Sequence, residues 1–250
     1  MTTRSTILIT GASSGLGEGM ARLFAAQGRN LALCARRLEN LEALRTELLA
    51  AHPRIQVEVR ALDVNDYDRV FQVFEELDQA LGGLDRIIVN AGIGKGQPLG
   101  TGAFHANRQT AETNFVAALA QCEAAMQIFR RHGRGHLVVI SSMSALRGMR
   151  KNITTYAASK AGVAALAEGL RSEMLGTPIK ISTLYPGYIR SAINEKVKNA
   201  PFIVDTETGC KALVKAINKE PAKACVPAWP WAPLGFAMRV LPLAIVRKMT

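Results

Sequence analysis

Short apolar runs alternate with segments of helical composition along most of this chain. Runs rich in β-branched and aliphatic residues, bounded by turn residues, occupy residues 5–10, 31–37, 55–62, 84–92, 135–140, 178–184 and 223–226. Segments typical of helices lie between them, at residues 18–28, 37–50, from about 66, about 104–132, 156–175 and 206–218. Because this alternation requires crossover connections, the pattern predicts parallel strands with helices on both faces.

The length and composition of the chain are sufficient for one sizeable core. It has 250 residues, of which 48% are hydrophobic. We therefore expect a single-domain α/β fold with a doubly wound parallel sheet of about seven strands. The predicted domain covers residues 1–226, and residues 227–250 form an apolar and basic tail.

A glycine-rich turn follows the first apolar run. Its spacing is Gly11-x-x-x-Gly15-x-Gly17, and a helix-like segment follows at once. Glycines allow the backbone to approach a phosphate closely, and the free N–H groups at a helix amino end favour anions. This context predicts a phosphate-binding loop. The alternative is a tight turn that holds no ligand.

Two arginines, Arg36 and Arg37, end the second run. Dinucleotide-binding folds place either an acid for the ribose hydroxyls or an arginine for a 2′-phosphate at this point. A guanidinium suits phosphate because it forms paired hydrogen bonds, and no acid is present here. We therefore expect NADP(H) rather than NAD(H). The alternative is that both arginines begin the exposed surface of the next helix.

Small or polar residues also follow the third and fourth runs. Asp63 and Val64 come after the third run, and Asp63 either binds an adenine amino group or caps the helix that starts near Asp66. Residues 90–92, Asn-Ala-Gly, end the fourth run. Their small side chains would let a cofactor lie against the backbone.

A serine, a tyrosine and a lysine follow the fifth run. Ser142 comes at the carboxyl end of a predicted strand, where open α/β sheets place ligands. Tyr156 and Lys160 are four residues apart in a proline-free segment, so they share one helix face. A phenol has a pKa of about 10, and a neighbouring ammonium favours its ionised form. The pair therefore predicts a tuned acid/base.

Asn114 lies inside the predicted helix at about 104–132. Asparagine is intrinsically unfavourable in the middle of a helix, so it often serves a local purpose. It either holds a water or a backbone group near a proton-transfer site, or it faces solvent on the helix surface.

These motifs occur in the order and spacing of the short-chain dehydrogenase/reductase (SDR) family, which the chain resembles over roughly residues 5–226. The resemblance implies a Rossmann-type fold and an NADP(H)-dependent oxidoreductase that interconverts a ketone or aldehyde and an alcohol by hydride transfer. By this resemblance, Tyr156 donates or takes the proton and Ser142 binds the same oxygen. Lys160 binds the nicotinamide ribose and lowers the tyrosine pKa, and Asn114 holds a water in the proton relay.

The residues that the resemblance implies for cofactor binding follow the carboxyl ends of the strands. They are Thr10, Gly11, Ser13, Ser14, Gly15, Leu16, Gly17, Arg36, Arg37, Asp63, Val64, Asn90, Ala91, Gly92, Tyr156, Lys160, Pro186, Gly187, Ile189 and Ser191. Ser191 stands where the family usually carries a threonine that contacts the carboxamide. Ser14 stands where NADP-dependent members often carry a basic residue, so the NADP(H) prediction depends on the two arginines alone.

The spacing between serine and tyrosine also departs from the family pattern. Ser142 lies fourteen residues before Tyr156, where thirteen is more usual. We interpret this as one extra residue in the loop 143–155. Ser144 is the alternative hydroxyl.

The formal net charge of +11 is concentrated in two segments. Residues 130–151 carry six Lys or Arg and no acid, and residues 186–250 carry ten against four acids. No zinc-finger spacing, aromatic RNA-binding motif or basic helix accompanies them, so we expect no nucleic-acid partner. Such patches suit anionic small molecules or an anionic membrane surface.

The location of the protein is predicted from its cysteines and its start. The four cysteines have no metal-site spacing, and the start leaves no room for a signal peptide before the first strand. We therefore expect a cytoplasmic protein with reduced thiols and no metal, with peripheral contact at the inner membrane surface as an option.

Two basic segments bear on the substrate. Arg147, Arg150 and Lys151 either attract an anionic or lipid-like substrate or form a solvated loop. In the tail, four prolines and Arg239 interrupt the roughly 20 apolar residues that a membrane-spanning helix needs. The tail lies in a membrane interface, covers the substrate pocket or packs at a subunit interface.

Oligomeric state and reaction type are implied only by the resemblance. It implies a homodimer or homotetramer in which the helices at about 104–132 and 156–175 form the interface. Four small residues on these helices either contribute to that interface or face the sheet: Ala117, Ala118, Ala164 and Ala165. The alternative functions are an NADP(H)-binding sensor or scaffold without turnover, and an epimerase or dehydratase.

Overall fold

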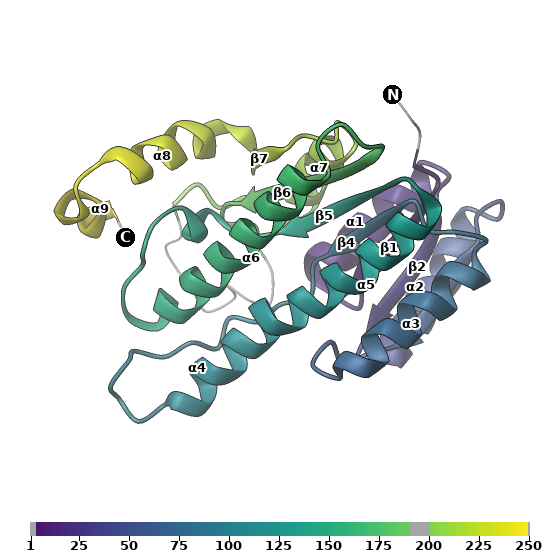
Figure 1. Cartoon of the computed structure of the whole chain (residues 1–250), viewed down its shortest axis with the longest axis horizontal. Helices are drawn as coiled ribbons and strands as arrows, with labels where there is room; N and C mark the ends of the chain where they lie inside the picture. Colours follow the sequence, from purple (N-terminus) through teal and green to yellow (C-terminus); the bar gives the residue numbers. More distant parts are fainter. Residues whose placement is uncertain (1–3, 191–200, 250) are drawn as a thin grey trace.

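The computed structural model describes residues 4–190 and 201–249, and within these ranges seven parallel strands form one sheet (Figure 1). The strands are β1 Thr6–Thr10, β2 Asn30–Ala35, β3 Val57–Ala61, β4 Arg86–Val89, β5 Gly135–Ile140, β6 Ile179–Pro186 and β7 Lys223–Val226. Their order is β3-β2-β1-β4-β5-β6-β7, which confirms the predicted doubly wound sheet. The order reverses between β1 and β4, and open α/β sheets bind ligands outside the carboxyl ends at such a point.

Helices cover both faces of the sheet (Figure 1). One face packs against α1 Gly15–Ala26, α2 Leu38–Ala51 and α7 Thr206–Ile217, and the other packs against α3 Tyr67–Ala80, α5 Ala117–His132 and α6 Thr154–Glu173. Alternate strand residues supply the two cores. Ile7 and Ile9 lie in the core that contains Phe24, while Leu8 lies in the core that contains Phe74. Burial on both faces explains why the strands are continuous apolar runs.

Two of the differences between predicted and observed boundaries lie near the site. The predicted helix at about 104–132 is divided into α4 Phe104–Ala111, a π-helical turn η1 Glu112–Val116, and α5. The sixth strand continues to Pro186, two residues beyond the predicted end, because β6 pairs with β7 as far as Val226. Pro186 is therefore the last residue of the strand, and the Pro-Gly pair does not interrupt the pairing.

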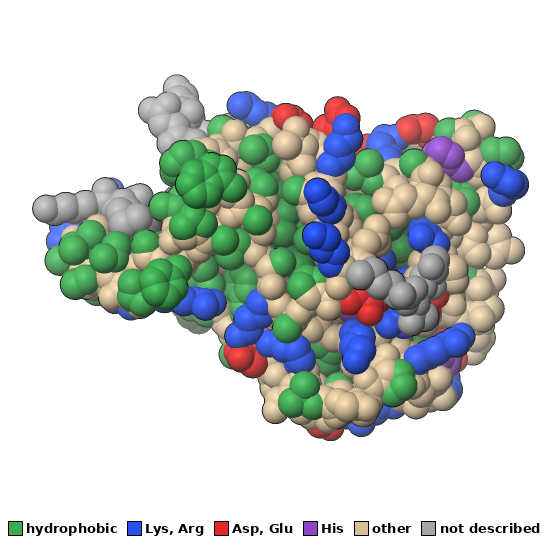
Figure 2. All heavy atoms as spheres, turned by 90° about the horizontal axis from the view of Figure 1, so that it is seen from above, with side chains coloured by type: hydrophobic (Ala, Val, Ile, Leu, Met, Phe, Trp, Pro, Cys, Tyr) green, Lys and Arg blue, Asp and Glu red, His purple; other side chains and the backbone are tan. Residues whose placement is uncertain are grey.

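The tail forms two helices, α8 Ala228–Val240 and α9 Leu243–Met249, which project beyond the sheet (Figure 1). Trp231 of α8 packs into a small apolar cluster with Met143, Ala164 and Tyr185. Hydrophobic side chains gather on the outside of this projecting end (Figure 2). Among the described residues, no helix combines the length and apolarity needed to cross a bilayer.

A buried polar network lies at the amino-terminal side of the sheet. Arg86 of β4 donates from Nε to His136 Nδ1 (2.9 Å) and from Nη2 to Glu220 Oε1 (3.3 Å). Arg4 donates to the same carboxylate oxygen (2.7 Å), and His136 of β5 bonds Ser182 of β6 (2.8 Å). The network therefore joins β4, β5, β6, the segment before β1 and the segment after α7.

The neutral state of His136 makes the stability of the fold depend on pH. Burial, together with the charges of Arg86 and Arg4, holds the pKa of His136 well below its ordinary value of 6.5. The unfolded chain takes up this proton below about pH 6.5, so there it binds more protons than the folded chain. We expect the free energy of unfolding to fall by about 1 kcal/mol between about pH 7.5 and about pH 5.5, measured by urea titration.

Histidine variants test the source of this effect. His136→Gln should lose most of the pH dependence, because glutamine does not titrate. His105→Gln, at an exposed position, should keep it. The carboxylates with lowered pKa values begin to protonate only below this pH range, so they contribute little to it. An equal pH dependence in both variants would contradict the assignment to His136.

Candidate active site at the carboxyl edge of the sheet

The glycine-rich turn lies at the carboxyl end of β1, beside the end of β4. Thr10 Oγ1 accepts hydrogen bonds from the backbone N of Asn90 (3.0 Å) and of Ala91 (3.1 Å), and Asn90 Nδ2 donates to the Thr10 carbonyl (2.9 Å). A Cβ atom on Gly17 would collide with the Gly11 carbonyl, so the turn can close in this way only with glycine there. The two loops are thus joined where the strand order reverses.

Arg37 joins the end of β2 to this turn. Its Nη2 donates to Ser14 Oγ (2.9 Å) and to Ser13 Oγ (3.2 Å). Ser14 precedes α1 but makes no side-chain hydrogen bond to the helix. The first N–H groups of α1 have no helical partners, and a helix amino end with a guanidinium beside it suits a phosphate. Arg36 is exposed next to Arg37, and Leu16 packs partly against the core.

Asp63 holds a turn after β3. Its Oδ1 accepts from the backbone N (3.0 Å) and from Nδ2 (2.9 Å) of Asn65. Asp66 caps α3 by accepting from the backbone N of Arg69 (3.2 Å). The alternative that Asp63 caps this helix is therefore wrong, because Asp66 is the residue directly before its first turn. Val64 is buried beneath the same loop.

Asn114 holds the loop that follows β4. It is 1% exposed in the π-helical turn, so the alternative that it faces solvent is wrong. Its Oδ1 accepts from the Ile93 backbone N (2.8 Å), and its Nδ2 donates to the Ile93 carbonyl (2.8 Å). A Cβ atom on Gly92 would lie 3.1 Å from Asn114 Oδ1 and 3.4 Å from Lys160 Nζ. A side chain at residue 92 would therefore crowd both polar groups.

Ser142 brings a hydroxyl from the end of β5 to Tyr156 on α6. The Ser142 hydroxyl lies close enough to the phenol to act on its pKa, which it lowers. Ser142 Oγ also accepts from the backbone N (3.2 Å) and the hydroxyl (3.0 Å) of Ser144, so Ser144 supports Ser142. Between Ser142 and Tyr156 the loop forms two 3₁₀ turns, η2 Met143–Leu146 and η3 Lys151–Ile153. The one extra residue expected in the loop 143–155 stays a prediction.

Tyr156 and Lys160 lie one turn apart on α6, and burial shifts both pKa values. Burial lowers the pKa of Lys160 to about 8, and its Nζ donates to the Ile140 carbonyl (2.9 Å). Burial raises the pKa of Tyr156 above its ordinary value of 10.0, although the Ser142 hydroxyl opposes this shift. The expectation of a lowered tyrosine pKa is therefore wrong for this structure. Desolvation outweighs the effect of this hydroxyl, and the ammonium is bound to the Ile140 carbonyl.

Comparison with known proteins agrees with this geometry. The family model described as short chain dehydrogenase matches residues 5–201. The chain belongs to the short-chain dehydrogenase/reductase family. This SDR protein is 55% identical to an uncharacterised oxidoreductase of Mycobacterium tuberculosis over 246 residues, which are 98% of this chain and 97% of the relative. The family is one of oxidoreductases.

Solved structures show the same fold. An alcohol dehydrogenase of Thermococcus sibiricus, complexed with 5-hydroxy-NADP, matches with a TM-score of 0.79 at 24% identity, over 88% of this chain and 95% of that one. The NADPH-dependent 3-quinuclidinone reductase of Rhodotorula rubra matches with a TM-score of 0.79 at 21% identity, over 89% of each chain. At such identities the likeness concerns the arrangement of strands and helices.

The site residues of this SDR protein at the carboxyl edge of the sheet fit a dinucleotide on structural grounds. The first turn of α1, with Arg37 beside it, is suited to phosphate. Lys160 is a buried ammonium with no carboxylate partner among the ion pairs of the described residues, so it retains donor capacity for a ligand hydroxyl. Gly92 leaves room above Lys160 and Asn114.

The segment after β6 is partly described. Pro186 ends β6, and a Cβ atom on Gly187 would strike the indole ring of Trp231. Ile189 is buried beside this turn. Ser191 lies outside the described residues.

Asn107 is a site residue that the sequence interpretation missed. It is buried in α4, and its Oδ1 accepts from the Gln97 backbone N (2.9 Å) and from Thr155 Oγ1 (3.1 Å). It therefore connects the loop after β4 with the residue before Tyr156. The available signal was an asparagine within a helix, the same signal that pointed to Asn114.

Trp231 is a second residue that was not predicted at the site. Its ring lies against Gly187 and meets the Tyr188 ring edge to face, with centroids 5.8 Å apart. The inner side of the tail therefore packs against the segment that follows β6. No local pattern distinguishes Trp231 from Trp229, because only the fold determines which of them faces inward.

The basic loop is bound to the tail through Arg147. Its Nη1 and Nη2 donate to the carbonyls of Arg239 (3.4 Å) and Leu241 (3.3 Å) at the end of α8. A cation at the carboxyl end of a helix satisfies free carbonyls. Arg150 and Lys151 are exposed, so they form the solvated part of this loop.

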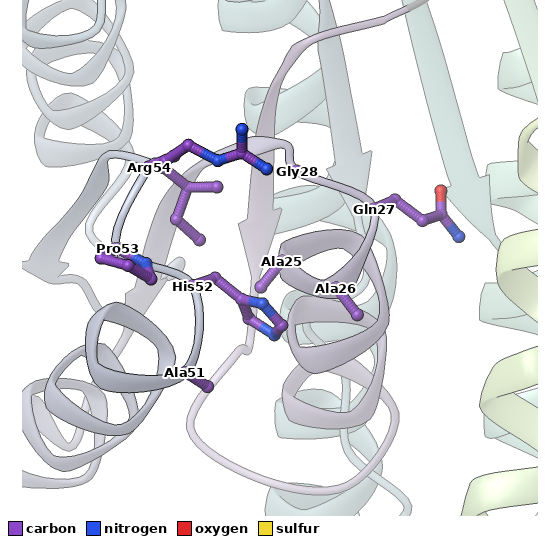
Figure 3. Close-up of a pocket in the computed structure, with 9 residues that line it drawn as sticks. Ala25, Ala26, Gln27, Gly28, Ala51, His52, Pro53 and Arg54 are labelled. Carbon is purple, nitrogen blue, oxygen red and sulfur yellow. The ribbon is translucent and has the colours of Figure 1, made fainter.

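Of two surface hollows, only the smaller one borders the loop between Ser142 and Tyr156. One of about 230 Å³ lies between the basic loop and α6, lined by Ala145, Arg147, Gly148, Met149, Thr154, Ala157, Ala158 and Ala161. A larger one of about 380 Å³ lies between the carboxyl ends of α1 and α2, where His52 and Arg54 are found (Figure 3). None of the predicted site residues lines the larger hollow, which lies near the amino ends of the strands.

Proposed function

We propose that this SDR protein is an NADP(H)-dependent oxidoreductase that interconverts a ketone or aldehyde and the corresponding alcohol. The observation that carries the proposal is the placement of Ser142, Tyr156 and Lys160, with Lys160 one turn from Tyr156, at the sheet edge that also carries the glycine-rich turn. This set combines a proton donor, a second hydroxyl for the same oxygen and a cation at a sheet edge that suits a dinucleotide.

Tyr156 is the acid/base in this proposal. Its raised pKa keeps the phenol protonated at neutral pH, which is the form that donates a proton to a carbonyl oxygen during reduction. Ser142 binds the same oxygen and orients it for the phenol. The nicotinamide, when bound, supplies or accepts the hydride at the carbon.

Lys160 and Asn114 support the proton transfer. With a pKa of about 8, Lys160 is mostly protonated at neutral pH and can donate to a ribose hydroxyl. Its positive charge beside the bound cofactor would favour the ionised form of Tyr156. Asn114 holds the loop after β4 through Ile93 and, in this proposal, positions a water that links Lys160 to bulk solvent.

A homodimer or homotetramer formed through α5 and α6 is part of the proposal. Val116 and Leu119 are exposed near the start of α5, and Ala165 is exposed on α6. Three of the small residues considered for this interface face the core of the same chain: Ala117, Ala118 and Ala164. The contact would therefore rest on the exposed apolar residues of the two helices.

Cofactor choice and turnover are tested together. The protein is assayed with NADPH and NADH against a panel of ketones and aldehydes, and we expect turnover with NADPH in preference to NADH. Arg37→Ala should raise the KM for NADPH by about 10- to 100-fold, because it removes a charge-assisted phosphate contact, and should leave the KM for NADH nearly unchanged. Arg36→Ala should have a smaller effect, since only Arg37 bonds the serines of the turn among the described contacts.

Arg45→Ala is the matched control, because this arginine lies on α2 and pairs with Glu42. It should leave both KM values unchanged. A preference for NADH in the wild type, or equal effects of Arg37→Ala on both cofactors, would contradict the NADP(H) proposal. Cofactor binding without turnover of any panel member would indicate a sensor or scaffold.

A further inference from the structure

Helix α8 is apolar on two opposite sides. Its inner side carries Trp231, Gly235 and Met238, which are buried. Its outer side carries Phe236 and Val240, four residues apart on one helix face, which are 69% and 60% exposed. A helix that is apolar all round normally has a partner on each side, and the fold covers only the inner side of α8.

The exposed apolar surface extends to both ends of the tail. Trp229, before the regular part of α8, is 79% exposed, and Leu243 and Ile245 on α9 are 60% and 46% exposed. We call Trp229, Phe236, Val240, Leu243 and Ile245 together the tail patch. Figure 2 shows hydrophobic side chains covering this projecting end of the molecule. Contiguous exposed patches of this kind mark interaction sites.

Positive charge lies beside the tail patch. Arg239 and Arg247 are exposed on the tail, and residues 227–250 contain no acidic residue. Arg147 binds the carbonyls at the end of α8 and so holds the basic loop beside the tail. Arg239 helps to lower the pKa of the Glu168 carboxyl on α6. Glu168 is already paired with Lys223 (2.7 Å). The border of the patch is therefore cationic.

We propose that the tail patch docks this protein onto an anionic lipid bilayer. Tryptophan and other large apolar side chains bordered by arginine are the composition of segments that lie in the plane of a membrane interface. The 13 residues of α8 extend about 20 Å, against the roughly 30 Å of a bilayer core, so the helix lies along the surface. Each cation near the surface adds attraction to anionic headgroups.

Charge favours the bilayer over a second copy of the chain. A two-fold contact between tail patches would bring the same surface of both copies together. It would place Arg239 and Arg247 of one copy close to the same cations of the other, which is unfavourable. An anionic headgroup layer instead supplies the opposite charge all along the border.

Vesicle sedimentation tests the proposal with the full-length protein. We expect it to sediment with vesicles of phosphatidylcholine mixed with phosphatidylglycerol, to sediment much less with phosphatidylcholine alone, and to lose binding as salt is added. The double variant Trp229→Ser with Phe236→Ser should bind the anionic vesicles at least roughly tenfold more weakly, because two large apolar side chains no longer insert.

The matched control removes two equally exposed apolar side chains elsewhere. Leu175 and Phe104 are 74% and 73% exposed and lie outside the tail. The double variant Leu175→Ser with Phe104→Ser should sediment as the wild type does. Circular dichroism and NADPH binding of each variant establish that it is folded.

Tryptophan fluorescence reports the contact directly. The chain has two tryptophans, and only Trp229 is exposed, since Trp231 is 5% exposed. Anionic vesicles should shift the emission to shorter wavelength. In Trp229→Phe this shift should vanish while sedimentation persists, because phenylalanine keeps the apolar contact and removes the reporter.

Two results would overturn the proposal. One is no sedimentation of the wild type with anionic vesicles, or equal sedimentation of the tail-patch and control variants. The other is that the tail-patch variant differs from the wild type in oligomer mass by light scattering and the wild type does not sediment with vesicles. That result would identify a second copy as the occupant. Neither result depends on catalytic activity.

Discussion

Tyr156→Phe is expected to lower kcat for carbonyl reduction by about a thousandfold, while the affinity for NADPH stays within about twofold of the wild type. The phenol lies beside the Ser142 hydroxyl, and burial keeps it protonated. Phenylalanine keeps the ring and its packing but removes the proton. Stopped assays of NADPH oxidation measure kcat, and a fluorescence titration measures cofactor binding.

Tyr67→Phe provides the control, since Tyr67 lies exposed at the start of α3. It should leave kcat unchanged. If Tyr156→Phe retained more than about a tenth of the wild-type kcat, Tyr156 would not be the principal proton donor. Loss of NADPH binding in the same variant would instead indicate that the tyrosine serves to hold the cofactor.

Glu220→Gln is expected to lower the free energy of unfolding by about 3 kcal/mol, because it leaves two buried guanidinium groups without their counter-charge. The carboxylate of Glu220 binds Arg4 and Arg86, which are 6% and 2% exposed. Burial already lowers the pKa of Arg86 to about 10, although the negative charge of Glu220 raises it. Glutamine keeps the size of the side chain, so the change isolates the charge. Urea unfolding at neutral pH measures the effect.

Glu168→Gln is the matched surface change. Glu168 pairs with Lys223, and their side chains are 60% and 36% exposed. Exposed pairs contribute little, so this variant should lose less than about 1 kcal/mol. Similar losses in the two variants would show that the network around Arg86 is no more important than a surface ion pair.

The sheet and most of its helices were predictable because their signals are local. Each strand is a continuous apolar run, since it is buried on both faces, and each helix has a composition that favours it. The fifth and seventh strands occur at the predicted residues, 135–140 and 223–226. The turn with Gly11, Gly15 and Gly17 also follows a local rule, because the residue type limits the backbone.

The polar contacts were less predictable, because their partners are distant in the sequence. Asp63 and Asp66 are both suitable caps, and only the backbone geometry shows that Asp66 caps α3. Arg4 and Glu220 are 216 residues apart, and no sequence pattern connects them. The direction of the pKa shift of Tyr156 depends on how deeply the fold buries the phenol.

The stretch from Ser142 to Lys160 shows what the sequence determines and what the tertiary structure determines. The order of its residues establishes which groups are available, and a four-residue spacing on a helix brings Tyr156 and Lys160 to one side. The tertiary structure decides that Ser142 lies beside the phenol and that Lys160 bonds the Ile140 carbonyl. It also decides that the basic loop holds the tail through Arg147. Local spacing limits which contacts a helix or turn can make, whereas burial and long-range hydrogen bonds exist only after the chain has packed.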